Sequence, residues 1–220
     1  MKKPGQVTEA PVTEPVSSAE PVLPDNPVDF DAQYDINEEI YAWLKIPGTN
    51  VDYPVLQSTE DDNYYLHRNV YKEYEFGGCL YTQCLNRRDF SDPNTVIYGH
   101  NMKNNTYFGT LQYFRDADFF AKNRYFYIYI PGHILKYEIF SAYEYDNRHI
   151  LNTVDFNNVT EFEEYLYSCQ HPSGFVQNVR DGIKLDINSK IVTLSTCVPS
   201  LTSTQRYLVQ GVLINDEKTK

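Results

Sequence analysis

Short strand-like segments separated by turn signals run through most of this chain, and they constrain its fold more than any other feature. Runs of β-branched and aromatic residues alternate with breakers such as Pro131-Gly132. Aromatic residues make up 15% of the chain, and their side chains suit pleated, half-buried surfaces. The candidate strands are residues 41–46, 51–56, 78–83, 95–99, 125–130, 135–145, 190–196 and 207–214. We therefore predict a mostly β fold that closes into a barrel or nearly does so.

Three segments carry helical signals instead. They are residues 35–40, 106–123 and 160–168. The first is a short helix for which Asp35 or Asn37 is the candidate N-cap. The second spaces its Phe and Leu residues by about three and four positions, which fits one or two short helices. The third opens with Thr160 and has Glu163 three residues later, the pattern of a capping box, so we predict a helix between the sixth and seventh strands.

The first 29 residues differ in composition from the rest of the chain. They hold six of the 12 prolines and almost no large apolar residue, so they cannot bury a core. We expect residues 1–29 to form a flexible linker and residues 30–220 to form one folded domain. Because a linker connects two parts of a protein, we expect that a membrane anchor precedes it and has been removed from this chain. A naturally flexible terminus is the alternative. No apolar run of about 18 residues occurs, so we expect the chain as given to be soluble.

The net charge limits the partners that this protein can bind. A formal charge of −11 repels phosphate backbones, and no cluster of Lys and Arg offers a basic patch. We therefore expect no nucleic-acid partner, and no binding to an anionic membrane surface.

Four cysteines occur, and none belongs to the C-x-x-C pairs that zinc sites use, so a structural metal is not expected. Cys79 and Cys84 are close enough in sequence for a hairpin to join them as a disulfide, or they are two separate thiols. Cys169 directly follows residues 160–168 in a helical-looking stretch and is interpreted as a small core residue. Cys197 remains as the candidate for chemistry.

Chemically useful side chains stand at the ends of three candidate strands. Residues 190–196 run directly into Cys197, and Arg206 opens the next strand. If these two strands pair as a hairpin, the thiol and the guanidinium lie at the same end of the sheet. His100 follows the strand at 95–99. Each residue alone has an ordinary structural explanation, but together they predict an acyl-transfer enzyme with a cysteine nucleophile.

These motifs resemble those of a known family, the sortases, which are cysteine transpeptidases of Gram-positive bacteria. The resemblance rests on T-L-S-T-C at 193–197, R-Y-L-V at 206–209, Y-G-H-N-M at 98–102 and W-L-K-I-P-G-T-N-V-D-Y-P-V at 43–55, and it covers about residues 36–214. The long separation of His100 from Cys197 and the helix near 160–168 are most similar to class B. The D-P-aromatic lid motif of pilus-assembling class C enzymes is missing before Trp43.

The resemblance implies a barrel of about eight strands with a short N-terminal helix, and it implies roles for six residues. Cys197 would be the nucleophile, His100 the general acid and base, and Arg206 the residue that stabilises the oxyanion. The residues expected to bind substrate are Ser195, Thr196 and Asn63. No metal or organic cofactor is required for this chemistry.

The resemblance also implies the partners. These are secreted proteins with a C-terminal sorting signal, of NPxT or related type, and an amine of a peptidoglycan precursor. The enzyme would work at the extracellular face of the cell membrane, which it would reach only through the missing N-terminal anchor. A pilus-type sortase and a hydrolytic cysteine protease would use the same three residues. A binding module that has lost turnover is the alternative outside the enzymes.

Overall fold

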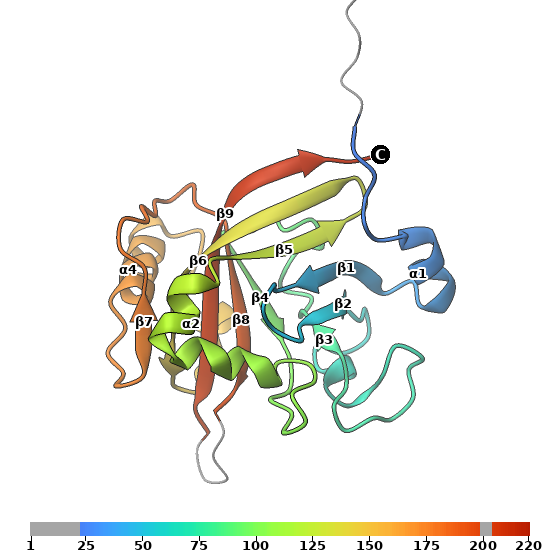
Figure 1. Cartoon of the computed structure of the whole chain (residues 1–220), viewed down its shortest axis with the longest axis horizontal. Coiled ribbons are helices and arrows are strands. Elements are labelled where there is room, and N and C mark those ends of the chain that lie inside the picture. Colours follow the sequence, from blue (N-terminus) through green and yellow to red (C-terminus); the bar gives the residue numbers. More distant parts are fainter. Residues whose placement is uncertain (1–22, 199–203) are drawn as a thin grey trace, which may run out of the picture.

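A closed β-barrel forms the body of the molecule (Figure 1). The structure is a computed structural model, and it describes residues 23–198 and 204–220. Its strands are β1 Ile40–Lys45, β2 Asp52–Leu56, β3 Leu80–Tyr81, β4 Asn94–Tyr98, β5 Tyr125–Ile130, β6 His133–Tyr145, β7 Gln177–Val179, β8 Ile191–Cys197 and β9 Arg206–Lys218. They run in the order β5-β1-β2-β3-β4-β8-β9-β6, and a β5–β6 pairing closes the ring. In the described part of the chain, β7 is the one strand outside this ring of eight, and it pairs with β6.

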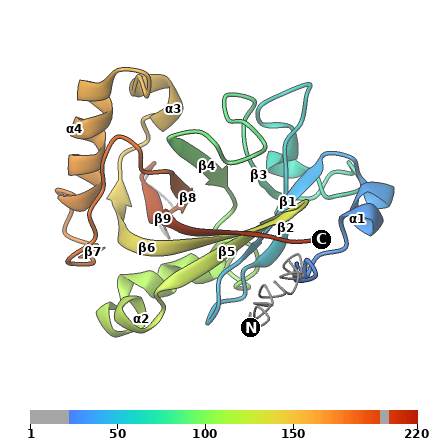
Figure 2. The same cartoon turned by 90° about the horizontal axis from the view of Figure 1, so that it is seen from above.

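Short helices surround the barrel. They are α1 Phe30–Ile36, α2 Ala117–Lys122, α3 Ile150–Thr153 and α4 Val159–Gln170, with the 3-10 helices η1 Tyr64–His67 and η2 Gly109–Arg115. Figure 2 shows α3 and α4 together on the side of the barrel opposite α1. Helix α4 lies in the chain between β6 and β8, which are the predicted sixth and seventh strands, and the short strand β7 that follows α4 was not predicted. It buries Phe162, Leu166 and Cys169, so Cys169 is the core residue that we expected.

The mostly β barrel of about eight strands is therefore confirmed, and so is the prediction of one or two short helices within 106–123, where η2 and α2 lie. The predicted position of the first helix, 35–40 with Asp35 or Asn37 as its N-cap, is wrong, because the helix is Phe30–Ile36 and β1 already begins at Ile40. The helix begins after Asp29, whose carboxylate accepts a hydrogen bond from the Ala32 amide, and it ends at Ile36. Asn37 follows α1 and does not cap the start of a helix. Its side chain instead donates to the Tyr65 hydroxyl and to the carbonyl of Val70, far along the chain.

The predicted cap of α4 is also wrong, by two residues. Asn158, not Thr160, is the N-cap, and its side-chain oxygen accepts from the amides of Thr160 and Glu161. Glu161 accepts in turn from the Asn158 amide group. Asn is at least as good a cap as Thr, and its position one residue before Val159 lets the helix start earlier.

Side chains fill the barrel, so it has no open channel through it. The rings of Phe126 and Tyr137 stack with centroids 5.0 Å apart and planes 6° apart. Gly211 of β9 lies against this pair, and a Cβ atom there would be 2.4 Å from the Phe126 ring. Since the interior is occupied, any reaction site has to lie on the rim or the outer surface.

All four cysteines are free thiols. Cys79 and Cys169 are buried, whereas Cys84 and Cys197 are exposed. Cys79 and Cys84 do not form the disulfide that the sequence left open. The Cys84 thiol instead donates to the carbonyl of Ser58 over 2.9 Å.

The N-terminal linker prediction falls partly outside the described residues, which begin at 23. The described residues before α1 contact the C-terminal end of β9 and the turn between β5 and β6. Asn26 donates to the carbonyl of Ile130 over 2.9 Å and to the Thr219 hydroxyl over 3.4 Å. The amide of Lys220 donates to the carbonyl of Pro24 over 3.0 Å. Among the described residues, no helix has both the length and the apolar character needed to cross a bilayer.

These contacts predict the effect of Asn26→Ala on stability. The substitution removes the side-chain bonds to Ile130 and Thr219. We expect the free energy of unfolding to fall by about 1 to 2 kcal/mol in urea denaturation. Asn152→Ala is the matched control, because the Asn152 side chain is exposed and makes no hydrogen bond within the described ranges. Equal stability of the two variants would show that the segment before α1 contributes nothing to the barrel.

Candidate active site

The ends of three strands meet at one edge of the barrel. Strand β8 pairs with β9 antiparallel, so that Cys197, the last residue of β8, lies opposite Arg206, the first residue of β9. Strand β8 also pairs with β4 in parallel, with Tyr98 opposite Ser195. The carboxyl ends of parallel strands lie at the same edge, and His100 comes two residues after β4 ends. The three predicted residues therefore belong to neighbouring strand ends.

The Cys197 thiol is exposed and lies beside the Arg206 guanidinium. Nη1 of Arg206 is 3.4 Å from Sγ of Cys197, and the same nitrogen donates to the carbonyl of Thr204 over 3.3 Å. A guanidinium next to a sulfur stabilises the thiolate, which is the nucleophilic form. Its planar set of N–H donors also suits an oxygen that gains negative charge.

His100 is held by one hydrogen bond that fixes the role of each ring nitrogen. Its Nε2 lies 3.0 Å from the carbonyl oxygen of Leu66. A carbonyl only accepts, so Nε2 carries a hydrogen and Nδ1 is the nitrogen that can take up or release a proton. Burial lowers the pKa of His100, the nearby His67 and Arg206 lower it further, and the bond to Leu66 opposes them.

His100 packs in an aromatic stack with two rings that the sequence did not single out. Its centroid is 5.2 Å from that of His67 and 5.5 Å from that of Phe76, with interplanar angles of 24° and 23°. The rings of His67 and Phe76 also face one another at 5.8 Å. His67 belongs to none of the sequence motifs described above. It comes from η1, and only the three-dimensional fold brings it to His100.

The backbone carbonyl of Cys197 is held by two amide side chains. Asn101 donates to it over 2.9 Å, and Gln112 of η2 donates over 3.4 Å. Asn101 directly follows His100, so this bond ties the segment that carries the imidazole to the end of β8. Neither amide was predicted, since a lone Asn or Gln has no sequence pattern that marks it.

The three residues expected to bind substrate lie in different surroundings. Ser195 and Thr196 of β8 are buried, and the Thr196 hydroxyl donates to the carbonyl of Gly99 over 2.7 Å. Asn63 is exposed at the start of η1, where its side-chain oxygen accepts from the Tyr81 hydroxyl over 3.3 Å. None of these contacts tests a role in substrate binding, which stays a prediction.

Asn63 is connected to the reactive edge through two stacked tyrosines. The rings of Tyr81 and Tyr98 lie 5.5 Å apart. Burial raises the pKa of Tyr98 to about 12, and the charge of Arg206 opposes this rise. Burial raises the pKa of Tyr81 too, again opposed by Arg206. Both phenols are therefore neutral at physiological pH, with Arg206 close enough to act on them.

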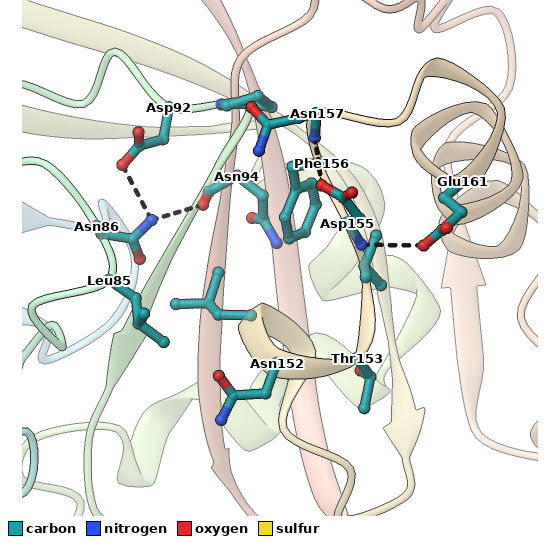
Figure 3. Close-up of a pocket in the computed structure, with 13 residues that line it drawn as sticks. Leu85, Asn86, Asp92, Asn94, Asn152, Thr153, Asp155, Phe156, Asn157 and Glu161 are labelled. Atoms are coloured by element: carbon teal, nitrogen blue, oxygen red, sulfur yellow. Dashed lines mark hydrogen bonds between the residues drawn. The ribbon is translucent and has the colours of Figure 1, made fainter.

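A separate pocket of about 580 Å³ lies between the β3–β4 connection and the α3–α4 segment (Figure 3). Several of its polar groups are bonded within the protein. Asn86 donates to Asp92 over 3.1 Å and to the carbonyl of Asn94 over 2.8 Å. The amide of Asp155 donates to Glu161 over 3.1 Å. Cys197 and His100 are not among the lining residues, so this pocket is not where the three strand ends meet.

Comparison with known proteins gives a consistent result. The family model for the sortase domain matches residues 44–214. Sortase B of Listeria monocytogenes is 36% identical over 182 residues, which are 81% of this chain and 71% of the Listeria protein. Sortase B of Staphylococcus aureus is 27% identical over a similar share.

Solved structures agree with the sequence matches. The crystal structure of Clostridium perfringens sortase B has a TM-score of 0.76 and 34% identity, and the match covers 85% of this chain and 100% of that one. A Streptococcus pyogenes class B sortase involved in pilus biogenesis has a TM-score of 0.72 and 33% identity, covering 85% of this chain and 98% of the other. The chain therefore belongs to the sortase family, and within it to the class B cysteine transpeptidases.

Proposed function

We propose that this protein cleaves the C-terminal sorting signal of a secreted protein at a threonine carbonyl and transfers the new carboxyl group to an amine of a peptidoglycan precursor. The observation that carries the proposal is the contact of Arg206 Nη1 with Cys197 Sγ, 3.4 Å apart at paired strand ends. A thiolate and a guanidinium in this arrangement can attack a carbonyl and stabilise the resulting oxyanion.

The first step forms a covalent bond between Cys197 and the substrate. The thiolate attacks the threonine carbonyl carbon, and the carbonyl oxygen becomes an oxyanion. Arg206 lies beside the sulfur, so its N–H groups can donate to this oxygen or to the neighbouring carbonyl of the peptide. The interaction strengthens as charge develops, which is what transition-state stabilisation requires.

His100 handles the proton that the leaving amine needs. Its Nε2 hydrogen is engaged by Leu66, so the imidazolium gives its proton from Nδ1 to the departing nitrogen as the tetrahedral intermediate collapses to the thioester. The neutral imidazole then takes a proton from the incoming amine, which attacks the thioester and releases Cys197. The product is an amide, and the thiolate and imidazolium are restored.

We further propose that Asn63, Ser195 and Thr196 help to place the signal. Asn63 is exposed and faces the tyrosine pair near Arg206, so it can contact an extended peptide directly. Ser195 and Thr196 are buried beneath the nucleophile, and the Thr196 bond to Gly99 fixes the end of β8. Similarity to class B enzymes supports an NPxT-type signal, and an N-terminal anchor would place the enzyme at the extracellular face of the membrane of a Gram-positive bacterium.

A pilin amine is the second candidate acceptor. It is favoured by the similarity to the Streptococcus pyogenes class B sortase, which is involved in pilus biogenesis. Hydrolysis is the third outcome, in which water attacks the same thioester. The chemistry at Cys197 is common to all three, so the products alone distinguish them.

Product analysis of an NPxT-containing peptide tests this function. We expect slow cleavage without an amine and a new amide product when a peptidoglycan-type amine is added. Cys197→Ala should abolish both reactions and leave stability within about 0.5 kcal/mol, because the side chain is exposed. Cys84→Ala, which removes the other exposed thiol, should retain turnover. Turnover by Cys197→Ala would rule out this nucleophile, and hydrolysis unaffected by any amine would rule out transpeptidation.

The rate of cleavage should depend on pH as a bell-shaped curve. The productive form needs a thiolate together with an imidazolium, so protonation of the first or deprotonation of the second stops the reaction. Burial lowers the pKa of His100, so its proton leaves at a lower pH than in an exposed histidine. We therefore expect one midpoint of the kcat/KM profile below about 6.5.

Phe76→Ala provides the control for this assignment. It removes one ring of the aromatic stack and so exposes His100 to water. Less burial lowers the cost of desolvating the charged imidazolium, so the midpoint of the kcat/KM profile assigned to His100 should move to higher pH. A rate that only rises with pH in both proteins would exclude His100 as the acid.

Arg206→Lys should lower kcat by about a hundredfold, on the scale of losing one oxyanion donor. A lysine keeps the positive charge but places a single ammonium on a flexible stem instead of a planar set of donors. KM should change less, because the contact is made mainly in the transition state. Alkylation of Cys197 by a small electrophile forms no oxyanion and should slow far less than turnover. Near-normal turnover by this variant would leave Arg206 with a role in substrate positioning only.

A further inference from the structure

Arg115, the last residue of η2, contacts β6 and β9 directly and is linked to the end of β8 through Gln112. Helix η2 contacts both β6 and β9, and Arg206 is the first residue of β9. Nε of Arg115 donates to the side-chain oxygen of Gln112 over 2.7 Å, and Nη2 donates to Glu144 of β6 over 2.7 Å. The guanidinium carbon lies 4.7 Å from the centroid of the Tyr207 ring. The side chains of Arg115 and Glu144 are each 24% exposed, so this is a half-buried ion pair.

The bond from Arg115 decides which way the Gln112 amide points. A guanidinium only donates, so the oxygen of Gln112 has to face Arg115. The amide nitrogen then faces the carbonyl of Cys197, to which it donates over 3.4 Å. If Arg115 were absent, this amide would be free to rotate, and the bond to the backbone of the nucleophile would no longer be enforced.

The contact with Tyr207 connects Arg115 to β9. Tyr207 directly follows Arg206 in β9, is fully buried, and lies opposite Glu144 in the β6–β9 register. Arg115 bonds to Glu144 and packs on the ring of Tyr207, so it joins this cross-strand pair. A cation over an aromatic face attracts it, and partial burial strengthens the attraction.

We propose that Arg115 is a positioning residue for the sortase reaction, which holds the end of β8 through Gln112 and the start of β9 through Tyr207. It thereby sets the placement of the Cys197 sulfur relative to the Arg206 guanidinium. The inference rests on the proposed function for its effect on turnover, but the placement itself also has a consequence for the free enzyme. A displacement of about 1 Å between reacting groups costs up to about a hundredfold in rate, so a modest loss of order here is measurable.

Arg115→Ala and Gln112→Met test the proposal by steady-state kinetics with the NPxT peptide. Met is uncharged and close to Gln in size, but it cannot donate to the Cys197 carbonyl. We expect kcat to fall about tenfold in each variant, with KM within about twofold of the wild-type value. Arg124→Ala is the matched control, since Arg124 also pairs with a glutamate, Glu138, and lies over a tyrosine ring, 5.9 Å from that of Tyr125. It should lose similar stability and keep its kcat.

A double-mutant cycle shows whether Arg115 affects kcat through Gln112 or whether the two residues affect kcat independently. If Arg115 acts on Cys197 partly through Gln112, the double variant should be much less impaired than the product of the two single effects. Arg115→Lys should recover part of the activity, because the ammonium can still pair with Glu144 but cannot also donate to Gln112 in the same geometry. Strictly multiplicative effects, or kcat unchanged in Arg115→Ala, would overturn the proposal.

Alkylation of the free enzyme tests the placement without any substrate. With Arg206 held beside the sulfur, the thiolate is stabilised, so Arg115→Ala should slow the alkylation of Cys197 by iodoacetamide several-fold near neutral pH. Cys84 in the same sample is the internal control and should react at its wild-type rate. If Arg115→Ala leaves the alkylation rate of Cys197 unchanged, the positioning role is refuted, whether or not the wild-type enzyme turns over the peptide. If the variant slows alkylation but the wild-type enzyme does not turn over the peptide, only the proposed function is refuted.

Discussion

The pairing of β8 with β9 is the interaction on which the reactive edge depends. Cys197 and Arg206 lie opposite each other because the backbone hydrogen bonds of the two strands set their register, not because the side chains attract one another. A shift of one residue in either strand would turn the side chains of that strand over and so place Cys197 and Arg206 on opposite faces of the sheet. The barrel closes the sheet and fixes this register along β8, which has β4 on one side and β9 on the other. The chemistry thus rests on strand pairing, and the side-chain network around it refines the distance.

His100 illustrates a balance between rigidity and protonation. The aromatic stack and the bond to Leu66 hold the ring in one orientation, which a proton donor needs. The same burial lowers the pKa of His100, so fewer molecules carry the imidazolium near neutral pH. Arg206 adds to this effect because it is a second positive charge near the ring. Arg206 therefore acts in opposite ways on its two neighbours, since its positive charge favours an anion at Cys197 and disfavours the charged form of His100.

Much of the fold could be predicted from the sequence, because it depends on local patterns. The turn signals and the β-branched runs placed all eight strands of the closed ring, and Cys197, His100 and Arg206 stood out as residues at strand ends. Helix starts were harder, since they depend on which of several polar residues caps the helix. Asn37 was expected as a cap, but its side chain is bonded to the distant Tyr65 and Val70. The side chains that support the site come from separate segments: His67 of η1 stacks on His100, and Gln112 of η2 donates to the Cys197 carbonyl. Nothing in their sequence spacing distinguishes them from surface residues.

The central claim is that the substrate becomes attached to Cys197 as a thioester. It is tested most directly by mixing the enzyme with an NPxT peptide in the absence of any amine, quenching in acid, and locating the adduct by mass spectrometry. The account predicts an adduct with the mass of the peptide up to its threonine, confined to the protein fragment that contains Cys197 and removed by added amine. An adduct on Cys84, or cleavage with no adduct at any time point, would contradict it.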